Sequence, residues 1–246
     1  MTVTKRQGKI LNRIVEEYID LAEPISSKLL EKKYDFGICP ASIRIEMQKL
    51  TDSGFISQPH TSAGRVPTDM GYRFFVDSLF KEAASKRRAS PLGRGISEFK
   101  NTLKIKEILK EEDTLKWTSQ LTKFLAEESS NFAVLHLISR DLLLKEGWEE
   151  ILKEPEFEEK DFLLEFTRFL ENFEENIDNW EINSGIKIYI GRENPFSKAK
   201  DFSIMSTKCH LPDKEEAIIS LLGPKRMAYD KNISLIDSLI KLLERL

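Results

Sequence analysis

Residues 55–69 of this chain read Phe-Ile-Ser-Gln-Pro-His-Thr-Ser-Ala-Gly-Arg-Val-Pro-Thr-Asp, and this stretch decides the fold of the segment around it. Its first four residues are β-prone, and Pro59 ends that short run. Thr68-Asp69 is typical of a helix N-terminus, and the residues that follow are expected to be helical as far as Phe80. The stretch therefore predicts a hairpin-like segment and a helix that packs it onto the core.

Three helices are predicted upstream of the hairpin-like segment. The first has one apolar face at the i, i+1, i+4, i+5 spacing, with Thr4 as its expected N-cap. The second is expected from Ser26 to about Lys33, before turn residues at 35–37. The third is expected to start near Cys39-Pro40, to bury Ile43, Met47 and Leu50, and to stop at Ser53-Gly54. This order of elements is that of a winged helix-turn-helix module, whose third helix enters the major groove of DNA.

The region after residue 96 is predicted to be a mixed α/β domain. Helical periods extend from Ile96 to Leu109 and from Trp117 to Glu128. Strands are expected at 132–138, 186–190, 202–206 and 217–222, and helices at 142–152, in the acidic stretch that follows, and at 234–246. The expected fold class is therefore α+β, with a DNA-binding domain at 1–82, a basic linker at 83–96 and an α/β domain at 97–246.

Length and composition restrict the class of protein. The chain has 246 residues, of which 40% are apolar and 32% charged, which is typical of a globular protein with two modest domains. No apolar run approaches the roughly 20 residues that a bilayer span needs, and residues 1–7 lack a signal-peptide apolar region. Cys39 and Cys209 are far apart and outside any paired spacing of a disulfide framework or a zinc site. We therefore expect a cytoplasmic protein with no membrane segment, cofactor or bound metal.

Charge is distributed unevenly along the chain. The net charge is -3, but residues 1–88 hold 15 Lys and Arg against 11 Asp and Glu, which is a net charge of +4. Residues 146–181 instead hold 14 acidic residues against three basic ones. The N-terminal part is therefore the candidate for binding a polyanion, whereas the acidic stretch is expected to repel nucleic acid. A solvated helical face and a protein-docking surface both remain open for that stretch.

Several motifs are similar to those of one known family of DNA-binding proteins. Residues 58–69, with 71–77, closely resemble the wing signature of the HrcA family of heat-shock repressors, and residues 7–18, 23–28 and 41–44 are similar to the rest of its DNA-binding domain. Residues 147–157, 188–196 and 222–229 resemble the GAF-like domain of the family. The resemblance implies a repressor that binds double-stranded DNA at an inverted repeat, the CIRCE operator, upstream of chaperone operons, and whose active form is supported by the GroEL chaperonin.

This chain is shorter than typical members of that family. The missing segment is the insert that members carry between the first strand of the GAF-like domain and its acidic helices, and that insert is associated with dimerisation in the family. Here residues 138–141 are expected to lead almost directly into the helix at 142–152. How two chains pair is therefore left open by the sequence.

The face of the third helix that lies opposite its buried positions is the predicted reader of DNA bases. At 100° per residue this face includes Ala41, and the candidate contacts are Ser42, Arg44, Ile45, Gln48 and Lys49. Arg44 is suited to guanine and Gln48 to adenine, and Ser42 to a base or a phosphate. Family members usually carry Asn where this chain has Ile45. We interpret that difference as an altered base preference at one operator position, through contact with a thymine methyl group, although contact with a neighbouring helix is the alternative.

Further candidates would contact phosphates. Lys5, Lys9 and Arg13 fall on one stripe of the first helix, which is either a phosphate contact or an ordinary solvated face. Gly64 permits a close approach of the backbone to DNA, and Arg65 beside it is suited to a phosphate or to a narrow minor groove. His60, Thr61 and Ser62 either add phosphate hydrogen bonds or only stabilise the turn. The basic residues 86–88 either track the backbone of the DNA or stay solvated.

An inverted repeat implies two copies of the module and hence a homodimer. The last helix has a wide apolar stripe, which is either part of a dimer face or fully covered by its own domain. The stripe comprises Ile233, Leu235, Ile236, Leu239, Ile240, Leu242, Leu243 and Leu246.

Two other classes of function compete with a repressor of chaperone operons. An enzyme is disfavoured because no P-loop, dinucleotide-binding glycine pattern, nucleophile elbow or metal-spaced cluster is present. A regulator whose GAF-like domain binds a small-molecule effector remains as the alternative, on fold analogy alone.

Overall fold

The computed structural model describes residues 3–89, 96–180, 182, 185–195, 200–212 and 214–245, without the side chains of 86–89, 96–101 and 179. Two sets of predictions lie outside these described residues. They are the roles of the side chains of residues 86–88 and of Leu246, and the centre of the predicted linker at 90–95. The chain divides into two compact units, Met1–Ser90 and Pro91–Leu246, which we call the N-terminal and C-terminal units. None of the helices described has both the length and the apolar character needed to cross a membrane.

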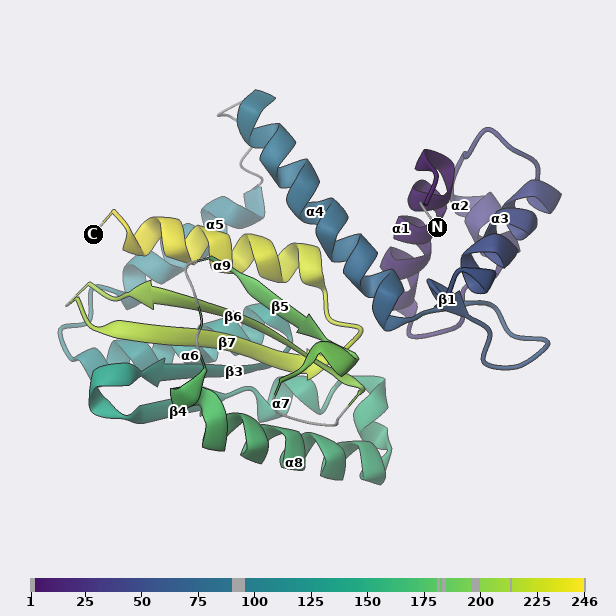
Figure 1. Ribbon diagram of the computed structural model, residues 1–246. Helices are drawn as coiled ribbons and strands as arrows, with labels where there is room; N and C mark the ends of the chain where they lie inside the picture. The colour runs from purple at the N-terminus through teal and green to yellow at the C-terminus, as the bar shows by residue number, and fades with distance from the viewer. Residues whose placement is uncertain are drawn as a thin grey trace. The chain divides into compact units, whose positions relative to one another are not determined.

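The N-terminal unit has the predicted order of elements (Figure 1). Its elements are α1 (Lys5–Leu21), α2 (Ser27–Lys33), α3 (Pro40–Asp52), β1 (Ile56–Ser57), β2 (Val66–Pro67) and α4 (Asp69–Ala89). β1 and β2 pair antiparallel, with Ile56 opposite Pro67 and Ser57 opposite Val66. The hairpin predicted from residues 55–69 is thus confirmed.

Local capping interactions explain where these helices begin. Thr4 Oγ1 accepts a hydrogen bond from the Gln7 N–H at 3.2 Å, and Gln7 Oε1 accepts one from the Thr4 N–H at 3.0 Å, which is a capping box. Ser26 caps α2 through the Leu29 N–H, and Thr68 Oγ1 accepts from the Gly71 N–H at the start of α4. The predicted N-terminal caps of α1 and α4 are therefore confirmed.

α4 is longer than its sequence pattern suggests. The pattern predicts a helix that ends at Phe80 and a linker that begins at residue 83, but α4 continues to Ala89. Residues 81–89 contain neither Gly nor Pro, so nothing in the backbone chemistry stops the helix before Ser90-Pro91. The first half of the predicted linker is consequently helical.

The C-terminal unit is a five-stranded antiparallel sheet with helices on both faces. Its elements are α5 (Ile96–Ile108), α6 (Thr114–Ser129), β3 (Phe132–Leu137), η1 (Ile138–Arg140), β4 (Leu142–Glu146), α7 (Trp148–Ile151), η2 (Pro155–Glu158), α8 (Lys160–Asn176), η3 (Ile177–Asn179), β5 (Lys187–Ile190), η4 (Gly191–Glu193), β6 (Phe202–His210), β7 (Glu216–Pro224) and α9 (Tyr229–Leu243). The strand order is β4-β3-β7-β6-β5. Figure 1 shows α8 on one side of the sheet and α9 on the other. Together with the N-terminal unit, this arrangement confirms the α+β class.

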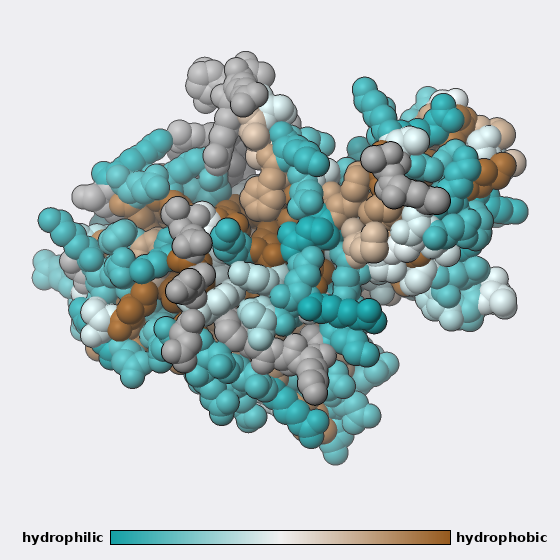
Figure 2. Space-filling model, in the orientation of Figure 1, coloured by the Kyte–Doolittle hydropathy of each residue, from teal (hydrophilic) through white to brown (hydrophobic). Residues whose placement is uncertain are grey.

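Aromatic packing forms the core between the sheet and α8. Phe166 of α8 is fully buried, and its ring lies 5.9 Å from that of Phe132 on β3 and 5.3 Å from that of Phe202 on β6. Phe169 stacks on Phe202 at 5.1 Å between ring centroids. The other side of α8 is solvated, and the surface over this helix is almost entirely hydrophilic at the bottom of Figure 2.

The first half of one predicted helix is a strand, while Trp148–Ile151 in its second half is helical as α7. Residues 142–152 are predicted to form a helix, but Leu142–Glu146 is β4, which pairs antiparallel with β3 from Leu137 opposite Leu142 to Ala133 opposite Glu146. Asp141 takes the left-handed conformation, with φ of 50°, and turns the chain back onto β3. The local sequence favours a helix, but pairing with the open edge of β3 decides the structure.

The apolar stripe of α9 is used mainly within its own unit. Leu235, Ile236, Leu239, Leu242 and Leu243 are buried, and α9 packs against α5, α6 and β6. Ile233 and Ile240 stay partly exposed. The stripe was predicted to be either part of a dimer face or covered by its own domain. Most of its residues are covered by the C-terminal unit.

A buried carboxylate joins α1 to α2. Glu17 is 4% exposed and accepts hydrogen bonds from Lys33 Nζ and Tyr34 Oη, each at 2.6 Å. Burial alone would raise the pKa of Glu17, but the hydrogen bonds from Lys33 and Tyr34 outweigh it and lower that pKa below its ordinary value. Burial and the bond to Glu17 raise the pKa of Tyr34 to about 12. The ionised carboxylate therefore stabilises the folded N-terminal unit.

We expect Glu17→Gln to lower the free energy of unfolding of the N-terminal unit by about 1–3 kcal/mol, because it leaves a buried hydrogen-bonded group without its charge. Since the folded pKa of Glu17 is lowered, its contribution is present above the unfolded pKa of about 4.3 and is lost as the pH falls through the folded value. Urea unfolding followed by circular dichroism at pH 7 and below pH 4 measures this difference.

Glu16→Gln is the matched control, because Glu16 makes an exposed ion pair with Arg13 at 2.5 Å. An exposed pair of this kind contributes at most about 1 kcal/mol. Equal destabilisation by the two variants at neutral pH would contradict the assignment of Glu17.

Candidate nucleic-acid interface

α3 separates a buried face from an exposed one, as its sequence pattern predicts. Ile43, Met47 and Leu50 are at most 3% exposed and pack against α1 and α2. The opposite side carries the exposed residues Ala41, Arg44, Ile45, Gln48 and Lys49, while Ser42 is partly buried. The 3.6-residue period of the helix therefore brings the predicted base contacts together on one solvent-facing surface.

Ile45 is a large apolar residue on this surface. Ile45 is 55% exposed, so more than half of the residue is accessible, and its contact with a base remains a prediction. Arg44 beside it is exposed and makes no ion pair with any described residue. A guanidinium and an aliphatic group thus lie next to each other, where both are accessible to a large partner.

Arg65 connects the β1–β2 loop (residues 58–65) to α3. Its Nε donates to Thr51 Oγ1 at 3.0 Å, and one of its terminal nitrogens donates to Gln48 Oε1 at 3.3 Å. Gln48 Nε2 in turn donates to Asp52 Oδ1 at 2.8 Å. These bonds fix the amide orientation of Gln48, with its oxygen toward Arg65. The predicted contacts Arg65 and Gln48, far apart in the sequence, therefore form one polar network on the C-terminal half of α3.

Gly64 is required for a close approach within the protein. A Cβ atom at this position would lie 2.5 Å from the Ile25 carbonyl carbon and 2.5 Å from the Pro24 oxygen. The neighbouring Arg65 exchanges two backbone hydrogen bonds with Ile25, both at 2.8 Å. Gly64 therefore fits the loop against the segment before α2, a role that differs from the approach toward DNA that the sequence alone indicates for this glycine.

The tip of the β1–β2 loop is exposed and internally bonded. Gln58 Nε2 donates to the carbonyl oxygens of Thr61 and Ala63, at 2.9 and 3.0 Å. His60 Nδ1 lies 3.1 Å from Ser62 Oγ, at hydrogen-bond distance. These bonds stabilise the turn, as one of the two hypotheses for His60, Thr61 and Ser62 proposes. All three residues are nonetheless exposed, and their phosphate contacts remain a prediction.

The basic residues of the N-terminal unit differ in their availability. Lys5 and Lys9 are exposed and have no ion pair with the residues that the structure describes. Arg13 is bonded to Glu16 and lies over the Tyr34 ring, 4.8 Å from its centroid. Lys49 pairs with Glu46 at 3.1 Å. The predicted stripe therefore consists of two available lysines and an arginine that is already engaged.

Two residues of the candidate interface were missed in the sequence. Thr51 and Asp52 hold Arg65 and Gln48 in place, yet neither was singled out. Thr51 lies seven positions after Arg44, which is two helical turns on the same face, so the period that selected Gln48 also reaches Thr51. The role of Asp52 depends on the rotamer of Gln48, which no sequence pattern gives.

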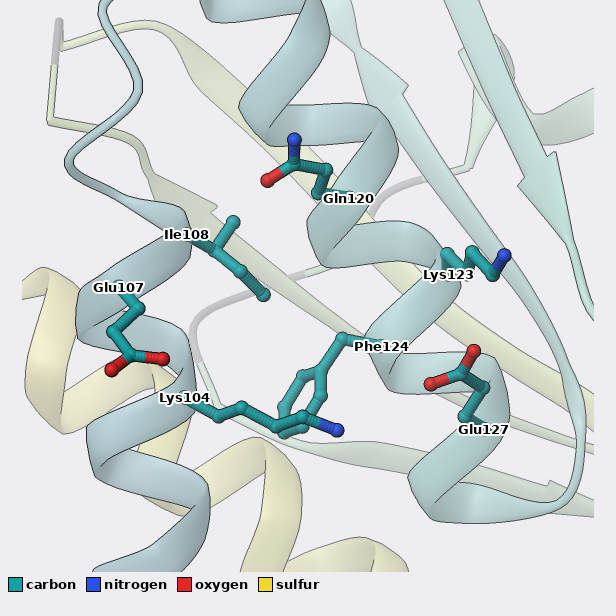
Figure 3. Close-up of a pocket in the computed structure, with 7 residues that line it drawn as sticks. All are labelled: Lys104, Glu107, Ile108, Gln120, Lys123, Phe124 and Glu127. Carbon is teal, nitrogen blue, oxygen red and sulfur yellow. The ribbon is translucent and has the colours of Figure 1, made fainter.

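The C-terminal unit contains a groove of about 380 Å³ between α5 and α6 (Figure 3). Five of the side chains that line it are charged or carry an amide, and two are apolar: Lys104, Glu107, Gln120, Lys123, Glu127, Ile108 and Phe124. The Lys104 side chain crosses the Phe124 ring, with its ammonium group 5.2 Å from the centroid. Effector pockets enclose most of a ligand, whereas this groove is open to solvent, so it gives little support to the small-molecule alternative.

One solved structure shares the fold over nearly the whole chain. A crystal structure of a hypothetical protein matches with a TM-score of 0.75 and 20% identity, covering 99% of this chain and 98% of that one. At this identity the similarity establishes the α+β fold alone.

Sequence comparison assigns the family. Residues 80–233 match the family model described as the HrcA protein C terminal domain. The heat-inducible transcription repressor HrcA of Natranaerobius thermophilus is 29% identical, with 96% of this chain and 94% of that protein covered. The protein of the same name from Carboxydothermus hydrogenoformans is 41% identical over 139 residues, which cover 55% of this chain and 40% of that one. The chain belongs to the HrcA family.

The alignment also supports the inference that this chain lacks a segment that its relatives have. It extends over 327 positions with the Natranaerobius protein, whereas this chain has 246 residues, so at least 81 aligned positions have no residue here. In this chain β3 connects to β4 through η1 and Asp141 alone. The short connection lies where the sequence analysis located the missing insert.

We expect Gly64→Ala to destabilise the N-terminal unit and to displace Arg65 from α3, because the new Cβ meets backbone atoms that cannot rotate away. Gly37→Ala is the control, since Gly37 has φ of +66° but no atom within 4 Å of the Cβ that alanine would add, so it reports backbone strain of about 1–2 kcal/mol without a clash. Thermal unfolding of both variants measures the difference. A Gly64→Ala protein as stable as Gly37→Ala would contradict the packing assigned to the loop.

Proposed function

We propose that this protein is a heat-inducible transcription repressor that binds a CIRCE-type inverted repeat and represses chaperone operons in the cytoplasm. Residues 3–89 act as a winged helix-turn-helix, with α3 in the major groove and the β1–β2 loop as the wing. The C-terminal unit acts as a GAF-like domain that pairs two chains and responds to the GroEL chaperonin. The names of the relatives support a repressor rather than an enzyme.

The observation that carries this proposal is the exposed face of α3. A helix that buries Ile43, Met47 and Leu50 on one side and presents Arg44, Ile45 and Gln48 on the other has the dimensions and the chemistry to enter a major groove. Arg65, which belongs to the β1–β2 loop, orients Gln48 by a hydrogen bond. A helix face that contacts only solvent does not require its side chains to be oriented in this way. Both features lie in the unit whose part of the sequence carries the positive charge.

Each side chain on this face has a distinct role in the proposal. Arg44, which has no competing ion pair in the described chain, donates two hydrogen bonds to O6 and N7 of a guanine. Ile45 packs on a thymine methyl group, and Gln48, held by Arg65 and Asp52, reads an adenine or contacts a phosphate.

Phosphate contacts flank these base contacts. Lys5 and Lys9 are accessible for them on α1, and Lys49 is accessible once its exposed pair with Glu46 opens. At the loop, Arg65 together with His60, Thr61 and Ser62 faces the backbone of the DNA. Such contacts add affinity without sequence information, and they make that affinity depend on salt.

Pairing of two chains follows from the symmetry of the operator. One module contacts one half-site, so an inverted repeat needs a homodimer with half-sites about one helical turn apart. Because most of the α9 stripe is buried within its own unit, pairing does not rely on that stripe as a whole. Response to heat would follow if the chaperonin is needed to restore the DNA-binding form.

Fluorescence anisotropy on an inverted-repeat duplex and on a scrambled duplex tests the proposal. We expect two chains per duplex and tighter binding to the inverted repeat. Arg44→Ala is expected to weaken that binding by roughly 5- to 150-fold, since a bidentate guanine contact contributes about 1–3 kcal/mol. Lys116→Ala is the control, because Lys116 is an exposed cation on α6. Equal affinity of the wild-type protein for both duplexes would contradict sequence-specific repression.

A second prediction concerns base preference. We expect Ile45→Asn to exchange a thymine preference for an adenine preference at one position in each half-site, because an amide pairs with the adenine edge whereas an aliphatic group packs on the thymine methyl. A set of duplexes that vary at single positions measures the exchange by competition. An unchanged preference at every position would exclude Ile45 from the base contacts.

A further inference from the structure

His136 is a buried side chain whose hydrogen-bonding capacity is unused. It lies on β3, opposite Leu143 of β4 and Ile218 of β7, and it shares the face of the sheet that Phe132 and Val134 present to α8. The side chain is 2% exposed, and neither ring nitrogen has a hydrogen-bond partner among the described residues. Burial of a polar ring without partners costs free energy, so a histidine at this position calls for a specific cause.

Two carboxylates lie at the edge of the core beside this ring. His136 Nε2 is 3.3 Å from Asp178 Oδ1 and 3.9 Å from Asp141 Oδ1. One potential ligand atom from each of the three residues lies within 4.8 Å of the other two. Asp141 occupies the left-handed turn between η1 and β4, and Asp178 belongs to η3 after α8. The fold thus places Asp141 and Asp178, which are 37 positions apart in the sequence, beside the Nε2 atom of His136.

The distance from His136 to Asp178 fits two ligands of one metal ion, whereas Asp141, at 3.9 Å, would have to move closer. Two ligand atoms that are each about 2.0–2.1 Å from one ion in tetrahedral coordination are roughly 3.3 Å apart, which is the separation of Nε2 from Asp178 Oδ1. An ion bound to both atoms lies off the line between them, so an imidazole lone pair directed at the ion does not point at the carboxylate oxygen. This agrees with the short distance and the lack of hydrogen-bond geometry in the described structure.

The surrounding charges leave both carboxylates available. Arg140, the cation next to Asp141, is paired with Glu215 at 3.0 Å. Lys145 on β4 is paired with Glu174 at 2.9 Å. Asp141 and Asp178 are 87% and 59% exposed at the side chain, so water can complete the coordination and Asp141 can move toward the ion. Two carboxylates also balance the charge of a divalent cation.

We propose that His136, Asp141 and Asp178 bind one divalent transition-metal ion, with Zn²⁺ as the preferred ion. Imidazole favours Zn²⁺ and its neighbours over Mg²⁺ and Ca²⁺, and a site with three protein ligands leaves the fourth tetrahedral position to water. The ion joins the β3–β4 turn to the C-terminal end of α8. It thereby stabilises the short connection between β3 and β4. Cysteine spacing does not reveal such a site, because no cysteine takes part.

Metal binding to the full chain tests this proposal. After the protein has been stripped with a chelator and dialysed, isothermal titration with ZnCl₂ is expected to give one ion per chain, and the melting temperature is expected to rise with free Zn²⁺. Asp178→Asn and Asp141→Asn, both at exposed positions, are each expected to weaken the affinity at least tenfold. Asp161→Asn, which removes a carboxylate from the opposite end of α8, is expected to leave the affinity unchanged.

Substitution by Co²⁺ identifies the ligands independently of affinity. The proposed site gives the visible absorption of a tetrahedral nitrogen and oxygen site, without a thiolate charge-transfer band, and Asp178→Asn abolishes that absorption. The exposed thiol of Cys39 is the competing ligand, and Cys39→Ser is expected to change neither measurement. Absence of stoichiometric binding at micromolar Zn²⁺, or binding that survives Asp178→Asn and disappears in Cys39→Ser, would overturn the proposal.

Discussion

The burial of Ile43, Met47 and Leu50 against α1 and α2 is the interaction on which the candidate interface depends. Three apolar side chains at i, i+4 and i+7 fix the rotation of α3 about its axis, and that rotation decides which residues meet the solvent. The β1–β2 loop is held beside the exposed face of α3 by two contacts. Gly64 packs against the backbone of residues 24–25, and Arg65 donates hydrogen bonds to Thr51 and Gln48. The packing of the core therefore determines which side chains of α3 are exposed to solvent.

The features that follow from local chemistry were predictable from the sequence. The capping box between Thr4 and Gln7 needs only residues three positions apart, and the two faces of α3 follow from a single helical period. The hairpin was predictable for the same reason, since β-prone residues, proline and glycine all lie within one short stretch. Most of the proposed base contacts come from this local information.

Features that depend on partners distant in the sequence were not predictable. Residues 142–146 have helical character by themselves and become β4 only because β3 offers an edge to pair with. The fit of Gly64 involves the backbone of Pro24, forty positions earlier, so the sequence alone points toward DNA as its cause. His136 looks like an ordinary strand residue until η3 brings Asp178 to within 3.3 Å of it. In each case tertiary contacts, rather than propensity, decide the outcome.

The central claim is that the exposed face of α3 reads guanine in the major groove through Arg44. Dimethyl sulfate protection on an inverted-repeat duplex tests it directly, because this reagent methylates guanine N7, the atom that a bidentate arginine covers. The account predicts a protected guanine in each half-site, about one helical turn apart, and loss of this protection with Arg44→Ala while the Lys116→Ala protein still protects. Binding that leaves every guanine N7 reactive, or protection that persists without the Arg44 side chain, would contradict it.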